Sequence, residues 1–430
     1  MAITGWFVAL VALGVVPVVL TGSGWAIVGW LGVVAALTVL DVALAASPRS
    51  LTIRRELPGA IRLGESAPAR LTVVNDGRRT LRGLVRDAWQ PSAGATPTRR
   101  RLSLRPGRAA TLTVTLTPFR RGERRAGGVT VRTVGPLRLA GRQATHEVPG
   151  AVRVLPRFSS RKHLPSRLAR LRELDGRTSV MIRGQGTEFD SLREYVRGDD
   201  VRSIDWRATA RRDDLVVRTW RPERDRRVVV VVDTGRTSAA RIDDEPRLDT
   251  AFESALLLGA LASRAGDRVD VVLFDRRVRG RVQGATGPAL LSSMVETMAP
   301  VEPELVETDW AAVPALVRSV TSRRALVVLA TTVDSPGASR SLLAAIPQLT
   351  RQHLVVVASV TDPALDETVM RRGTRDEVYR AASAERARLD QGRVAAALRQ
   401  VGADVVTGAP ADLPPALADR YLALKAAGRL

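Results

Sequence analysis

The run Val228-Val229-Val230-Val231-Val232, followed at once by Asp233-Thr234-Gly235-Arg236-Thr237-Ser238, decides the fold of the C-terminal half. Consecutive β-branched residues are typical of a strand buried on both faces, as in a parallel sheet covered by helices. Further apolar runs and helical stretches alternate along the rest of the chain, the runs at 269–274, 325–330 and 354–358 and the helices at 248–265, 289–298, 310–320, 339–349 and 374–401. Residues 228–430 are therefore predicted to form a Rossmann-like α/β domain.

Oxygen-bearing side chains follow the predicted strands of this domain. Asp233 and Thr237 come after the first strand, Asp334 follows the third apolar run, and Thr308 precedes a helix between them. Ligands of such sheets bind beyond the carboxyl ends of the strands, and carboxylate and hydroxyl oxygens suit Mg²⁺ but not zinc or copper. The alternative is structural, because Asp and Thr after a strand often cap helices or form turns.

Two uncharged stretches near the N-terminus, residues 5–20 and 25–40, approach the length that crosses a bilayer. No basic residue precedes Arg49, and a second apolar stretch follows the first, which is unlike a signal peptide. Residues 1–47 are therefore predicted to form a two-helix transmembrane hairpin. The expected location is the cell membrane, with a multi-pass anchor.

The charges around this hairpin predict its orientation. Arg49, Arg54 and Arg55 lie just after the second apolar stretch, whereas the connecting loop is short and uncharged. By the positive-inside rule, both ends of the hairpin and the soluble domains should face the cytoplasm. Asp41, near the end of the second stretch, is interpreted as an interfacial carboxylate in preference to a buried residue of an ion pathway.

Residues 48–150 show short runs of alternating apolar and polar residues separated by turn residues, which predicts a β-sandwich. The segment is strongly basic, with 21 basic and 7 acidic residues in 1–150. The formal net charge of +22 belongs to the N-terminal half, since residues 228–430 carry 25 charges of each sign. GC-rich codon usage would give the excess of Arg over Lys without any function. The alternative is a functional basic surface, such as one that contacts anionic lipid, because the charge is clustered in one half. No nucleic-acid partner is expected.

Composition excludes several classes of enzyme. The chain has no Cys, and its three His residues are far apart and match no zinc spacing. Only Lys162 and Lys425 are lysines, and neither lies in a phosphate-binding Gly-x-x-x-x-Gly-Lys motif. Zinc sites made of thiolates, Cys nucleophiles and Walker-type nucleotide hydrolysis are therefore excluded.

The loop after the first strand resembles the metal-ion-dependent adhesion site of von Willebrand factor A domains, which has an Asp-x-Ser-x-Ser loop, a distant Thr and a further Asp. Asp233 matches the first Asp, Thr237 replaces the second Ser, and Gly235 stands where the first Ser should be. Thr308 corresponds to the distant Thr and Asp334 to the last Asp. The resemblance implies a degenerate Mg²⁺ site, since Gly235 lacks one hydroxyl ligand.

A second resemblance covers essentially the whole chain. The segment 184–211, GQGTEFDSLREYVRGDDVRSIDWRATAR, is similar to the signature of the domain of unknown function 58 (DUF58) family. The family implies two membrane spans, a β-rich region, a connector carrying this signature (151–227 here) and a von Willebrand factor A-like domain. It further implies a MoxR-type AAA+ ATPase as partner. The chain is expected to be an adaptor and not an enzyme.

The signature leaves two alternatives open. Glu188, Asp199, Asp200 and Asp205 alternate with arginines, which favours an ion-pair network. The opposing hypothesis is a metal-dependent hydrolase or nuclease that uses these carboxylates. A third hypothesis is a membrane scaffold without metal, motivated by Gly235. Tyr195 and Trp206 of the same segment are expected to anchor it against a neighbouring domain.

Overall fold

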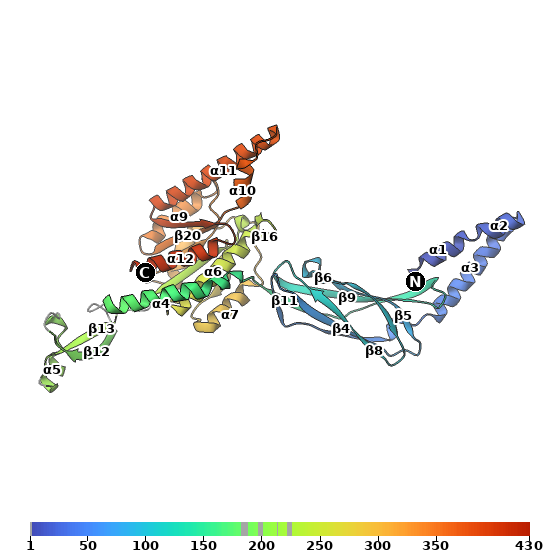
Figure 1. Cartoon of the computed structure of the whole chain (residues 1–430), viewed down its shortest axis with the longest axis horizontal. Coiled ribbons are helices and arrows are strands. Elements are labelled where there is room, and N and C mark those ends of the chain that lie inside the picture. The colour runs from blue at the N-terminus through green and yellow to red at the C-terminus, as the bar shows by residue number, and fades with distance from the viewer. Residues whose placement is uncertain (1, 182–187, 197–200, 213, 222–225) are drawn as a thin grey trace. The chain divides into compact units, whose positions relative to one another are not determined.

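The structure is a computed structural model that describes residues 2–181, 188–196, 201–212, 214–221 and 226–430 (Figure 1). The chain divides into two compact units, Met1–Leu155 and Pro156–Leu430. Each unit has its own sheets and its own core.

The first unit is a β-sandwich. One sheet contains β1 (Ala2–Ile3), β3 (Ala60–Arg62), β5 (Leu81–Trp89), β7 (Arg99–Leu104), β9 (Gly122–Val134), β10 (Ala140–His146) and β11 (Ala151–Leu155). The other has the order β2 (Leu51–Glu56), β4 (Ala67–Asn75), β8 (Ala109–Leu116), β6 (Ala95–Thr96). Leu71 and Val73 of β4 share a buried core with Val85 of β5 and Val131 of β9. Because β11 belongs to this unit, the sandwich extends to Leu155, beyond the predicted end at residue 150.

Three apolar helices precede the sandwich: α1 (Gly5–Ala12), α2 (Val15–Thr21) and α3 (Trp25–Leu44). In the described part of the chain, the helix that begins at Trp25 is the one long and apolar enough to cross a membrane, whereas Gly5–Thr21 is shorter. At about 1.5 Å per residue, a 20-residue helix such as α3 matches the roughly 30 Å of a bilayer core. The indole Nε1 of Trp30 in α3 donates to the carbonyl of Leu10 in α1 at 3.0 Å.

Both ends of this helical segment attach to the same part of the sandwich, the turn between β9 and β10. At the N-terminal end, β1 pairs with the first residues of β10. At the other end, Asp41 of α3 is fully buried and accepts the backbone N–H groups of Leu137, Leu139 and Ala140 at 2.7, 2.8 and 3.0 Å. Asp41 is thus buried within the protein as the acceptor that organises this turn, and its position at the membrane interface stays a prediction.

The second unit is built on a six-stranded sheet. Its order is β18 (Val278–Val282), β17 (Arg268–Phe274), β14 (Arg227–Asp233), β19 (Leu326–Ala330), β20 (Leu354–Val360), β21 (Ala403–Gly408). All neighbours are parallel except β17 and β18. In chain order this is 3-2-1-4-5-6, the doubly wound arrangement with its switch point between β14 and β19.

Helices cover both faces of this sheet. Side chains of α8 (Val313–Val320), α9 (Arg340–Thr350) and α11 (Arg375–Gln400) form one core with Val229 and Val231 of β14. On the other face, α6 (Arg247–Arg264) contacts β14 and β17, and α12 (Leu413–Ala426) packs beside α6 (Figure 1). The predicted α/β organisation of this half is confirmed, with every residue from Val228 to Val232 buried.

The segment predicted as a connector belongs to the second unit. Its helix α4 (Leu164–Met181) is longer at both ends than the 166–174 stretch expected from the sequence. Arg167 and Arg170 of this helix pair with Asp419 of α12 at 2.6 and 3.0 Å. Beyond α4, β12 (Glu188–Glu194) and β13 (Val216–Arg221) form a two-stranded sheet that carries α5 (Trp206–Arg212).

Candidate functional site

The site lies at the carboxyl edge of the sheet, where β14 and β19 meet. Asp233 is the last residue of β14, and Thr331 directly follows β19. The two strands are parallel and in register from Val228 to Val232, so their ends lie side by side. Since the chain leaves these two strands in opposite directions, a crevice opens here, which is the usual ligand position of a doubly wound sheet.

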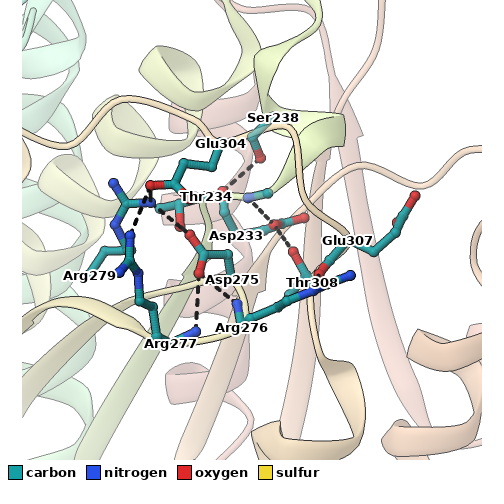
Figure 2. Close-up of polar contacts among 11 residues, drawn as sticks. Asp233, Thr234, Ser238, Asp275, Arg276, Arg277, Arg279, Glu304, Glu307 and Thr308 are labelled. Carbon is teal, nitrogen blue, oxygen red and sulfur yellow. Dashed lines mark hydrogen bonds and ion pairs between the residues drawn. The ribbon is translucent and has the colours of Figure 1, made fainter.

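Asp233 is the centre of a hydrogen-bond network. Asp233 is only 1% exposed, and its carboxylate accepts four hydrogen bonds. Oδ1 accepts from the hydroxyl of Thr308 at 2.5 Å and the N–H of Gly235 at 2.8 Å. Oδ2 accepts from the hydroxyls of Thr331 at 2.7 Å and Thr237 at 3.1 Å. Three hydroxyls from three separate loops thus converge on one carboxylate, and Figure 2 shows the contact with Thr308.

The fourth predicted residue is not part of this network. Asp334 lines the same small cavity as Asp233, but its carboxylate pairs with Arg247 of α6 at 3.4 Å. The cavity has a volume of about 20 Å³, which is room for one water-sized sphere. Asp233, Thr237 and Thr308 are therefore brought together as predicted, while Thr331 occupies the place that the sequence analysis gave to Asp334.

There is no room for a side chain at position 235. Its φ of −80° is open to any residue. A Cβ atom there would lie 2.3 Å from Oγ1 of Thr308 and 2.8 Å from the carbonyl oxygen of Val306. The side chain of Thr308 thus fills the space that a Ser at position 235 would need, and its hydroxyl reaches Asp233 instead.

A second buried carboxylate, which the sequence analysis missed, lies beside the site. Asp275 follows β17 and accepts the backbone N–H groups of Arg276 and Arg277 at 2.6 and 3.1 Å and the hydroxyl of Thr234 at 3.0 Å. Arg279 pairs with it at 3.0 Å. Burial raises the pKa of Asp275, but the hydrogen bonds outweigh burial and the pKa is lowered. The signal in the sequence was an Asp directly after the second apolar run.

Charged pairs surround these two carboxylates. Glu304 pairs with Arg279 at 2.5 Å and Arg277 at 3.1 Å (Figure 2), and Glu307 pairs with Arg236 at 2.6 Å. Arg236 and Glu307 also line the cavity next to Asp233. The rim of the site is thus a set of Arg–Glu pairs, which are individually weak where they are exposed.

In the signature segment, one carboxylate has a clear structural role. Oδ1 of Asp205 accepts the N–H groups of Arg207 and Ala208 at 3.0 and 3.1 Å at the start of α5, and Oδ2 accepts from Arg218 at 2.8 Å. The hydrogen bond from Arg218 is the largest of the causes that lower the pKa of Asp205. Gly184, Gly186, Asp199 and Asp200 lie outside the described residues, and Glu188 is described only as a position in β12 opposite Arg221.

Of the two aromatic residues of this segment, Trp206 differs from expectation. Trp206 is 66% exposed at the start of α5, so it does not anchor the segment by burial. Tyr195 is half-buried, and its N–H donates to the carbonyl of Leu215 at 2.7 Å.

Comparisons with known proteins give distant relatives and solved structures of low similarity. Relatives from Mycobacterium bovis and Mycobacterium tuberculosis, each described as an uncharacterized protein, are 30% identical over 186 residues, or 43% of this chain. The match spans 57% of the relatives' own length. A CARDB domain from Pyrococcus furiosus is 18% identical with a TM-score of 0.20, covering 26% of this chain and 94% of that one. Salmonella alpha-2-macroglobulin is also 18% identical, with a TM-score of 0.19, covering 24% of this chain and 7% of that one.

The model of a protein family matches the segment that contains β13, five of the six strands of the main sheet of the second unit (all but β21) and the Asp233 network. Residues 191–400 belong to the family described as "Protein of unknown function DUF58".

Proposed function

We propose that this protein is a membrane-anchored, cytosol-facing adaptor whose von Willebrand factor A-like domain docks a partner at the Asp233 network. The observation that carries the proposal is the convergence of three threonine hydroxyls on one buried carboxylate at the switch point of the sheet. The strand order 3-2-1-4-5-6 with an antiparallel third strand supports the von Willebrand factor A-like assignment.

The anchor is proposed to be the two-helix hairpin formed by α1–α2 and α3. The length of α3 and the exposure of Trp6, Val19, Leu20 and Trp25 support insertion into lipid. The two ends of the segment return to the same β9–β10 turn, which requires an even number of crossings and so favours a hairpin. The arginines after α3 favour the cytoplasmic side for the rest of the chain.

The residues at the site fit a hard cation such as Mg²⁺. A hydroxyl that donates a hydrogen bond to Asp233 keeps its oxygen lone pairs for a metal, so Thr237, Thr308 and Thr331 remain available as ligands. The described residues contain no group of three or more His, Cys, Asp or Glu that could hold a metal ion. Among the described residues that line the cavity, Asp233 is the carboxylate without an arginine partner, because Asp334 pairs with Arg247 and Glu307 with Arg236.

With one protein carboxylate as ligand, a bound cation would keep positive charge with which to attract a partner. A bound Mg²⁺ would supply an electrophilic site with a vacant ligand position, which an acidic side chain of a partner fills. Asp233 and the three threonines position that vacancy, while the Arg236–Glu307 pair lies at its rim. Following the family resemblance, the proposed partner is a MoxR-type AAA+ ATPase.

Calorimetric titration of the full chain in detergent tests the metal step. Mg²⁺ should release or absorb heat with the native chain, and Asp233→Ala should abolish the signal. Asp244→Ala is the matched control, since Asp244 is an exposed carboxylate on a loop of the same unit. Affinity capture from the native cell then tests the partner, which should be recovered with divalent cation and lost with chelator. Equal recovery of the partner with and without the chelator would refute metal-dependent docking.

The metal-free scaffold is a second candidate, favoured by one observation. Asp233 already has four hydrogen-bond donors, and Thr308 fills the space next to Gly235, so the network is complete without an ion. Absence of any heat with Mg²⁺, together with a lower melting temperature of Asp233→Ala, would favour this candidate. The hydrolase hypothesis gains no support from Asp205, whose two oxygens are used by α5 and Arg218.

A further inference from the structure

Five arginines surround a groove in the first unit, on the sheet that contains β7, β5 and β9. They are Arg79, Arg82, Arg101, Arg132 and Arg138, and we call this feature the arginine groove. Its volume is about 740 Å³, within the usual range of ligand pockets. Among the described residues that line it, there is no Asp or Glu. The groove is thus a concave surface of one sign of charge.

The register of the strands explains why these charges gather. Leu84 of β5 lies opposite Arg101 of β7 on one side and Arg132 of β9 on the other. Side chains of directly opposed residues share a face of the sheet, so two arginines flank one leucine. Arg82 lies two residues from Leu84 and points to the same face. Val85, which alternates with them, is buried in the sandwich core, so the arginine row lies on the outer face.

The positive charges of the groove are not neutralised. None of the five arginines forms an ion pair with a carboxylate in the described part of the chain. Arg79 and Arg132 donate instead to the carbonyls of Ala43 and Ile3, both at 2.5 Å. Nε of Arg132 is buried and has no partner. Guanidinium groups that lack counter-charges repel one another and attract an anion, and their geometry fits the oxygens of a phosphate.

The position of the groove indicates where the phosphate comes from. Leu44, the last residue of α3, and Ala46 line the groove together with the arginines. The end of a helix that spans the bilayer core lies at the level of the lipid headgroups. Leu84, Val134 and Pro136 add apolar lining, which suits the glycerol and upper acyl part of a lipid better than a free ion.

We infer that the arginine groove binds the phosphate headgroup of an anionic phospholipid in the leaflet where α3 ends. This inference rests on the membrane anchoring proposed above. The contact involves one outer face of the sandwich and one row of side chains, unlike the general attraction of a basic domain to the membrane. Each well-placed arginine at an anionic surface contributes about fivefold to affinity, so removal of two should cost about 25-fold.

The test compares two double variants of the full chain in detergent micelles. Arg82→Ala/Arg101→Ala removes two charges from the groove. Arg54→Ala/Arg70→Ala removes two exposed charges from β2 and β4 of the other sheet and is the matched control. Binding of phosphatidylglycerol, phosphatidylcholine and inorganic phosphate is measured for each, and thermal unfolding confirms that both variants fold.

The native chain should prefer phosphatidylglycerol over phosphatidylcholine, the groove variant should lose about 25-fold of that affinity, and the control should stay within about twofold. Equal losses in both variants would overturn the inference in favour of general charge attraction. Inorganic phosphate that displaces the lipid at equal concentration would overturn the lipid as its source. The anchoring is tested separately: a native chain that fails to float with neutral phosphatidylcholine vesicles refutes the anchor, whereas one that floats without any phosphatidylglycerol preference refutes only the groove.

Discussion

Replacement of Gly235 by Ala is predicted to destabilise the second unit through two close contacts of the added Cβ. The added Cβ would lie 2.3 Å from Oγ1 of Thr308 and 2.8 Å from the carbonyl of Val306. Thr308 could turn aside only by giving up its hydrogen bond to Asp233. The carbonyl of Val306 is backbone and already accepts the N–H of Arg236 at 2.8 Å, so it is less able to move.

The magnitude follows from two opposing effects. Overpacking of this kind costs about 1–3 kcal/mol. Because φ at Gly235 is −80°, Ala is compatible with the backbone and gains about 0.4–1 kcal/mol by restricting the unfolded chain. The free energy of unfolding of the second unit should therefore fall by about 1–2 kcal/mol. For a domain of this size, that is a drop in melting temperature of about 5 °C.

Hydrogen exchange of the β14 amides, measured on the full chain, reports the second unit separately from the sandwich. Gly337→Ala is the matched control, since Gly337 lies in the same unit and a Cβ there meets nothing within 4 Å. In a Thr308→Ala background, the cost of Gly235→Ala should shrink by about 1 kcal/mol, because the nearest clash is gone. A Gly235→Ala variant as stable as the Gly337→Ala control would refute the placement of Thr308.

Three further predictions concern buried titratable side chains. Asp41→Ala leaves three backbone N–H groups without an acceptor, so the sandwich should lose about 3 kcal/mol or more and become sensitive to protease; unchanged resistance would contradict the role of Asp41. Nζ of Lys425 lies 3.0 Å from Oδ1 of Asp267, and the two side chains are 8% and 2% exposed. Lys425→Met should therefore lower the free energy of unfolding, measured with urea, by about 3 kcal/mol. Adding Asp267→Asn should recover part of that loss, and no recovery would argue against the pair. Burial lowers the pKa of His353 below its ordinary 6.5, so the unfolded chain takes up a proton first as pH falls. The free energy of unfolding should therefore decline below about pH 6.5, and His353→Gln should flatten this decline if the ring is its cause.

Much of the second unit could be predicted because its signal is local. Five consecutive valines indicate a strand buried on both faces, and the residues after such strands lie at one edge of the sheet. Asp233, Thr237 and Thr308 follow from this rule. The pairing of Asp334 could not be predicted in this way. Its partner Arg247 lies on a helix 87 positions away, and sequence spacing does not reveal which carboxylate an arginine will pair with.

The features that sequence reasoning missed depend on contacts between distant segments. The place of Asp41 near the end of an apolar helix did not reveal its role in the turn, because the backbone N–H groups that donate to it lie about a hundred residues away, after β9. The strand β11 lies beyond the predicted end of the sandwich because it pairs with β9 and with β3, near the start of the domain. The gap at Gly235 looked like decay of a site, whereas the structure fills it with Thr308.

The attachment of both ends of the apolar segment to a single turn limits how the sandwich can move. A domain held by one covalent connection can swivel about it. Here β1 is hydrogen-bonded into the sheet and Asp41 holds the neighbouring loop, so two points a few residues apart fix the orientation. Torque on the sandwich would consequently reach the apolar helices as rotation of the whole segment, so the first unit would act as a rigid connection and not as a flexible one.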